Sequence, residues 1–145
     1  EIPEGGNRLE AVKRVGLHWG AIDPEGALGW VEQLSGEEQV AAMAEVARGW
    51  SQQNPRSVTD YLENLPKGGT RDGAISGLVA GVGQQDPESA WLWSGQIEGA
   101  EIRNEAREAA VGWWAETDIE AAREALEQAH LPRAEAEALR AILKR

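Results

Sequence analysis

A short dipeptide recurs along this chain at a nearly constant interval, and this repetition constrains the fold more than any other feature. The recurring positions are Asp23-Pro24, Asn54-Pro55, Asp86-Pro87 and Asp118-Ile119, at spacings of 31, 32 and 32 residues. Two aromatic columns keep the same interval. Trp19, Trp50, Val82 and Trp114 stand four residues before each Asp or Asn, and Trp30, Tyr61, Trp93 and Ala125 stand seven residues after it. Repetition at this interval is typical of repeat architectures.

Each dipeptide predicts the start of a helix. An Asp or Asn side chain can accept hydrogen bonds from the free backbone N–H groups of a first turn. A proline at the first helical position loses no intrahelical bond. Carboxylates in the first turn interact favourably with the helix dipole, and they are present at Glu25, Glu88 and Glu120. We therefore expect the second helix of a helical hairpin to begin at each dipeptide.

A first helix is expected before each dipeptide, because apolar residues recur there at helical spacing. The four stripes are Val12, Val15, Gly16 and Trp19; Met43, Val46, Ala47 and Trp50; Ile75, Leu78, Val79 and Val82; and Arg107, Ala110, Val111 and Trp114. The fourth stripe departs from the pattern by opening on an arginine. Ser35-x-x-Glu38 predicts a capping box, and Pro132 is expected to open a last helix that carries Leu139, Ile142 and Leu143.

The sequence thus predicts one all-α domain over residues 1–145, a right-handed α/α solenoid of about four antiparallel hairpins and a C-terminal helix. About nine helices are expected. The predicted units span approximately residues 6–34, 35–65, 66–97 and 98–129, and the terminal helix spans 132–144. The chain opens Glu1-Ile2-Pro3 without an initiator Met, so we expect it to be part of a larger protein.

The first-helix stripes resemble the tetratricopeptide repeat, as in Val12-x-x-Val15-Gly16-x-x-Trp19 and Met43-x-x-Val46-Ala47-x-x-Trp50. The resemblance covers nearly the whole chain. Two features depart from the family: the period is two or three residues shorter than the usual thirty-four, and the Asp-Pro turn is not part of its signature. The resemblance implies a concave groove lined by first helices, with peptide or protein binding as the usual function.

The resemblance and the positions of the tryptophans give two sets of candidate partner-binding residues. If the resemblance holds, the concave wall carries Lys13, Arg14, Leu17, Glu45, Arg48, Ser76, Gln84, Glu108 and Gly112. Trp91 and Trp113 fall outside the repeat columns, and we interpret them as candidate binding anchors because Trp is enriched in interface hot spots. Trp113 could instead fill space left by Arg107. The strip Gly73, Gly77 and Gly81, with Gly83 after it, favours close approach between helices, with a smooth partner-binding patch as the alternative.

Charge and residue chemistry narrow the function. The net charge of −11 disfavours nucleic acid, which needs a basic footprint. There is no cysteine and no apolar run long enough to insert into a membrane. His18 and His130 lack companions for a triad or metal site, and Glu120, Glu124 and Glu127 are interpreted as a solvated stripe. We predict no catalytic residue, no metal and no cofactor.

The expected function is therefore a non-catalytic protein–protein interaction scaffold. Its partner would be a protein or peptide segment or a flanking domain of the same chain. Two alternatives stay open: a repeat region attached to or forming part of an enzyme, and a structural spacer in a surface assembly. Converging carboxylates in a deep pocket would favour the enzyme, whereas an apolar patch around Trp91 and Trp113 would favour docking.

Overall fold

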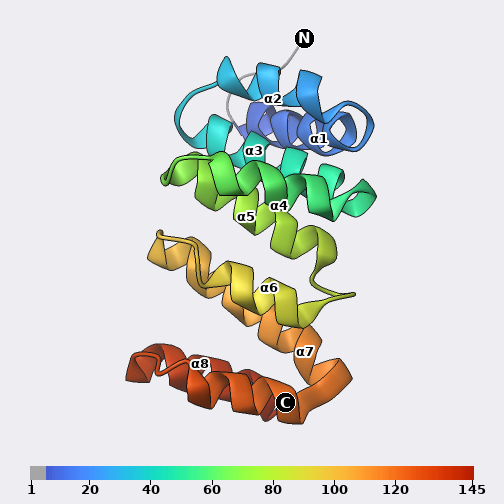
Figure 1. The fold of residues 1–145 in the computed structure, drawn as a ribbon. Helices are drawn as coiled ribbons and strands as arrows, with labels where there is room; N and C mark the ends of the chain where they lie inside the picture. Colours follow the sequence, from blue (N-terminus) through green and yellow to red (C-terminus); the bar gives the residue numbers. More distant parts are fainter. Residues whose placement is uncertain (1–5) are drawn as a thin grey trace.

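The computed structural model describes residues 6–145, and every regular element within them is helical. Figure 1 shows the helices stacked along one direction, from α1 and α2 at the N-terminal end to α8 at the C-terminal end. The helices are α1 (Gly6–Ile22), α2 (Pro24–Glu32), α3 (Gly36–Gln53), α4 (Pro55–Asn64), α5 (Gly69–Val82), α6 (Pro87–Ser94), α7 (Ala100–Gln128) and α8 (Arg133–Leu143). The opening Glu1-Ile2-Pro3 lies outside the described residues.

The Asp/Asn-Pro dipeptides begin helices as predicted. The side chains of Asp23, Asn54 and Asp86 accept hydrogen bonds from the backbone N–H groups of Gly26, Ser57 and Ser89, at 3.2, 3.3 and 3.1 Å. The proline in each case is the first residue of α2, α4 or α6. These caps fix where each second helix starts.

The fourth dipeptide lies inside a helix, so the described residues contain eight helices and not about nine. At φ −154° and ψ 83°, Asp118 has nearly the backbone conformation of the other caps. It also accepts from the N–H of Ala121 at 3.1 Å. The residues before and after Asp118 are helical, so α7 passes through this position with a kink. Ile119 stands where the other units have proline, so the N–H that proline lacks is present here.

Helices α1, α3 and α5 pack closely, side by side, and glycines make this possible. A Cβ added at Gly73 would lie 2.7 Å from the carbonyl oxygen of Val40. A Cβ at Gly77 would collide with the carbonyl of Ala44, and one at Gly49 with the carbonyl of Leu17. The interpretation of the Gly73, Gly77 and Gly81 strip as a close helix–helix approach is therefore confirmed.

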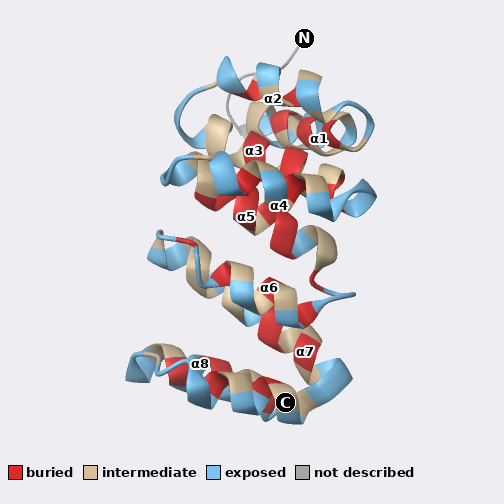
Figure 2. Ribbon diagram, viewed as in Figure 1, coloured by how far each residue is buried: buried red, intermediate tan, exposed pale blue. Residues whose placement is uncertain are grey.

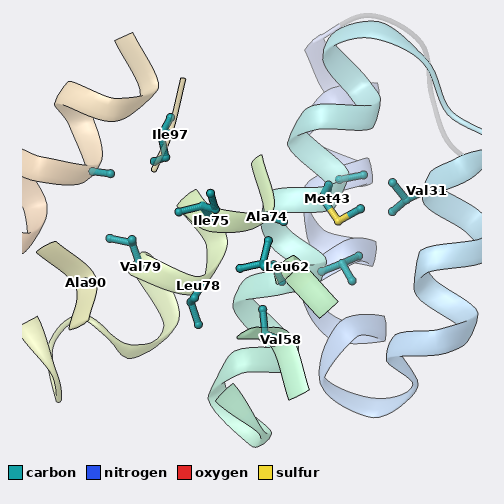
Figure 3. Packing of buried hydrophobic residues seen from close by; sticks show 14 of the residues in the cluster. Val31, Met43, Val58, Leu62, Ala74, Ile75, Leu78, Val79, Ala90 and Ile97 are labelled. Atoms are coloured by element: carbon teal, nitrogen blue, oxygen red, sulfur yellow. The ribbon is translucent and has the colours of Figure 1, made fainter. Parts of the chain in front are cut away.

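The buried residues lie between the helices and form two clusters (Figure 2). The larger cluster runs from α1 to α7, and Figure 3 shows side chains of α4 and α5 within it, Leu62, Ile75 and Leu78 among them. The smaller cluster joins α7 to α8 through Val111, Trp114, Ala122, Leu126, Leu139 and Leu143. Each second helix contacts the first helices on either side of it in the chain.

The aromatic columns pair within the first two helix pairs. The ring centroids of Trp19 and Trp30 are 5.7 Å apart, and those of Trp50 and Tyr61 are 5.5 Å apart. Burial, with a smaller contribution from the charge of Glu32, raises the pKa of Tyr61. These columns therefore serve packing, as their position in the repeat predicted.

Two sequence predictions are wrong in detail. Val15 was expected in the core stripe, but it is 38% exposed, whereas its equivalents Val46, Leu78 and Ala110 are at most 2% exposed. Val46 lies against Gly16 of the preceding first helix, whereas no helix of residues 6–145 precedes α1. The capping box at Ser35 does not form: its side chain makes no cap hydrogen bond, and Glu38 pairs with Arg8 at 2.6 Å.

Candidate binding groove

A groove runs between the first half of α7 and α8. Three adjoining hollows form it, of about 170, 450 and 490 Å³, and Glu108 borders all three. Glu135, near the start of α8, faces Arg103 and Arg107, and Arg145, just beyond its end, lines the hollow that contains Gly112. The two helices therefore run in the same direction along the groove.

Small and apolar side chains line the groove between charged margins. Gly112, Ala138 and Ile142 border the middle hollow, and Trp113 borders the largest one with Ile119. The carboxylates of this margin come from α7 at Glu105, Glu108 and Glu116, all of them exposed, and Arg145 is the cation opposite. The groove thus combines apolar contact area with an acidic margin.

Gly112 differs from the glycines of the helix stack. A Cβ added at Gly112 would meet nothing within 4 Å, whereas one at Gly77 would collide with α3. A glycine inside a helix costs about 1 kcal/mol relative to alanine. At Gly77 close packing explains that cost. At Gly112 no contact within the described chain does, and the position faces the groove.

Trp113 is half-buried and contributes both to the packing against α5 and to the lining of the groove. Its ring packs against Gly83, at the end of α5, closely enough that a Cβ there would collide with it. The same residue borders the largest hollow of the groove. In the repeat, Trp113 is equivalent to His18, Gly49 and Gly81, so a large indole stands where units two and three have a close-packed glycine. The earlier tight spacing of first helices is not repeated between α5 and α7.

Trp91 covers the arginine that breaks the fourth stripe. The Arg107 guanidinium lies 5.7 Å from the centre of the Trp91 ring and 3.6 Å from the Glu135 carboxylate, which also lies 3.8 Å from Arg103. The buried Nε of Arg107 has no hydrogen-bond partner within residues 6–145. Burial and the nearby Arg103 lower the pKa of Arg107, and Glu135 partly offsets them. Trp91 is thus a packing partner of Arg107.

Replacing Arg107 by methionine is expected to leave stability unchanged or to raise it by about 1 kcal/mol. The Nε of Arg107 is buried without a hydrogen-bond partner, the 3.6 Å contact with Glu135 is longer than a hydrogen bond, and Arg103 still faces Glu135 in the variant. Arg103→Met is the matched control, because Arg103 donates to the carbonyls of Ile97 and Glu98 at 3.2 and 3.1 Å. We expect that control to lose about 1 kcal/mol in urea unfolding. A larger loss for Arg107→Met would show that its pairing with Glu135 stabilises α8.

The predicted partner-binding residues are spread over several helices. Arg14 and Gln84 are exposed, Lys13 and Ser76 are partly buried, and Leu17 lies at the contact of α1 with α3. Arg48 pairs with Glu45 at 2.8 Å on its own helix. Of the predicted wall, the groove brings together only Glu108 and Gly112, with Trp113 beside them.

Sequence reasoning missed Glu105, Ala109, Glu116 and Ile119 on α7. It also missed the second wall of the groove, which Ala138 and Ile142 on α8 form with Arg145 just beyond its end. The fourth-unit positions thirty-two residues earlier are Ala106, Ala110 and Trp113, so the repeat interval itself carried a signal. It placed Ile142 in a first-helix stripe but gave no indication that this stripe borders an open groove.

Comparison with protein-family models gives no match, and comparison with curated proteins and with solved structures gives no significant one. Within residues 6–145, no group of three or more His, Asp or Glu side chains is placed to hold a metal ion. None of the helices in this part of the chain has the length and apolar character needed to cross a membrane. The groove is therefore interpreted from its own geometry.

Proposed function

We propose that this protein is a non-catalytic interaction scaffold of the helical-repeat type, a tetratricopeptide-like α/α solenoid that docks a segment of another protein between α7 and α8. The observation that carries the proposal is Gly112. Its open position in the wall of a groove would let a docked backbone approach α7 as closely as α3 approaches α5 at Gly77.

The lining of the groove supports docking over catalysis. Its wide hollows offer Ile119, Ile142 and the Trp113 ring as apolar contacts, and a half-buried aromatic ring at the end of a groove is a common interface anchor. The carboxylates lie exposed at the margin and do not converge in a deep pocket. Exposed carboxylates at this position are suited to form ion pairs with a partner.

Selection of peptides from a random display library against the immobilised protein tests this function. We expect the enriched synthetic peptides to bind in a fluorescence anisotropy titration and to lose at least about tenfold in affinity with the Gly112→Gln variant. The glutamine side chain would occupy the groove without displacing any neighbour, so the variant should fold normally.

Gly29→Gln is the matched control, because Gly29 is also a helical glycine with nothing within 4 Å of an added Cβ, and it does not line the groove. It should leave binding unchanged. If every selected peptide binds both variants as it binds the parent protein, the groove is not the docking site and the proposal fails.

A further inference from the structure

The groove also indicates what kind of segment it takes. We propose that its occupant is a basic amphipathic α-helix of a partner protein, which places small apolar residues against Gly112 and lysine or arginine residues along the acidic margin. This inference rests on the proposed function and adds the chemistry of the partner to it.

The walls of the groove favour a helix over an extended segment. Both walls are α-helices, whose backbone groups are bonded within the helix and offer no strand edge for an extended peptide to pair with. The lining of α7 recurs at Glu105, Ala109, Gly112 and Glu116, which spans about three turns, or about 16 Å. A groove of this length between two helices that run in the same direction fits the apolar face of a third helix.

The fold shows how such a helix would pack. At Gly73, Gly77 and Gly81 the α5 backbone lies against the carbonyls and small side chains of α3. Gly112, with Ala109 on the same wall, offers a similar small-residue surface, and a Cβ added at Gly112 would meet nothing within 4 Å. An occupant with alanine or glycine at the contact and one larger apolar residue toward Trp113 would reproduce the same kind of packing.

Charge indicates that this helix is basic. Within the part of the chain that the structure describes, Glu105, Glu108 and Glu116 have no ion-pair partner, as is true of many exposed glutamates of this chain, but these three border the groove. Glu105 and Glu116 lie on the strip of α7 that holds Gly112, before and after it along the helix, and Glu108 lies beside that strip. The chain as a whole carries −11. Electrostatic attraction would therefore select a basic partner and accelerate its encounter.

In the two wide hollows an acidic occupant would meet three carboxylates, Glu105, Glu108 and Glu116, and Arg145 as the one lining cation. The other end of the groove is no better for it. There Arg107 is already stacked on Trp91 and faces Glu135, so its charge is partly neutralised within the fold. The observations thus favour the basic helix over an acidic segment, and the acidic segment becomes an outcome of the test.

Three synthetic helical peptides of 20 residues provide the test. The first has an alanine and leucine face flanked by lysines, the second replaces the lysines by glutamates, and the third carries a central proline in the lysine sequence. Fluorescence anisotropy of the labelled peptides measures binding. We expect the lysine peptide to bind, and the glutamate and proline peptides to bind at least about tenfold more weakly.

Two triple variants with the same change in net charge distinguish binding in the groove from nonspecific electrostatic attraction to the acidic chain. The triple variant E105Q/E108Q/E116Q should weaken binding of the lysine peptide about tenfold. E120Q/E124Q/E127Q, on exposed positions of the second half of α7, changes the net charge equally and should weaken it less than twofold. Equal weakening by both triples would overturn the inference, because binding would then be unspecific electrostatics.

The same experiments distinguish failure of this inference from failure of the proposed function. Display-selected peptides could fail to bind the Gly112→Gln variant and yet be acidic or tolerate a central proline. In that case the groove is a docking site, but the inference that its occupant is a basic helix is wrong. If neither selected nor designed peptides respond to Gly112→Gln, both proposals fail. Binding of the glutamate peptide that is abolished by Arg107→Gln would assign the polar end of the groove to an acidic partner and would also overturn the inference.

Discussion

Replacing Gly77 by alanine is expected to lower the free energy of unfolding by about 3 kcal/mol, which corresponds to a loss of about 6 to 12 °C in melting temperature for a domain of this size. The added methyl group would collide with the carbonyl oxygen of Ala44 and with the side chain of Ala47. Neither atom is the end of a flexible side chain, so the contact can be relieved only by moving α5 away from α3.

Gly29→Ala and Gly112→Ala are the controls for this prediction. Both glycines are inside helices with open space around an added Cβ, so alanine should stabilise them by about 0.5 to 1 kcal/mol through its higher helix propensity. Thermal unfolding followed by circular dichroism measures all three variants. A melting temperature of Gly77→Ala equal to that of the parent protein would mean that α3 and α5 are not in backbone contact.

Local chemistry made the helix starts predictable from the sequence. A cap is formed by residues only three positions apart, so Asp23, Asn54 and Asp86 could be interpreted without knowledge of distant neighbours. The repeat interval then extended that local conclusion along the chain. It located even the kink at Asp118, where the proline is missing.

Contacts between distant residues limited the rest of the prediction. Ser35 and Glu38 have the spacing of a capping box, but Arg8, thirty residues from Glu38, binds its carboxylate instead. Arg107 breaks a stripe of the repeat and Trp91 falls outside its columns, and in the sequence these are separate irregularities. In the structure each is the neighbour of the other.

The candidate site was predictable only in part for the same reason. The i, i+4 strip of Gly73, Gly77 and Gly81 predicted a close-packed glycine at Gly77, and the repeat register placed Gly112 in the wall outside the core columns, as the structure has them. The sequence did not indicate the packing of the Trp113 indole on Gly83, where units two and three place Gly49 and Gly81 against the preceding first helix. From this point the first helices no longer pack as tightly, and the groove follows.

Asp72 carries the second large effect that we expect, because it links α5 to the start of α7. Its carboxylate is buried and accepts from the backbone N–H groups of Glu98 and Gly99, each at 2.9 Å. Gly99 is the cap residue of α7. Alanine at position 72 would leave both donors without this acceptor at a partly buried site. We expect a loss of about 3 kcal/mol, since hydrogen bonds to charged groups contribute about 1.5 to 3 kcal/mol each.

Urea unfolding of Asp72→Ala, Asp72→Asn and Asp86→Ala measures this link. Asparagine offers a single acceptor oxygen and should lose less than alanine does. Asp86 caps α6 at an exposed site, and its replacement by alanine should cost about 1 kcal/mol. Hydrogen exchange at the amides of Glu98 and Gly99 should accelerate in Asp72→Ala alone. Equal losses for Asp72→Ala and Asp86→Ala would show that the carboxylate acts only as a local cap, and that the closely packed α1–α3–α5 stack holds the groove-bearing helices by apolar contact alone.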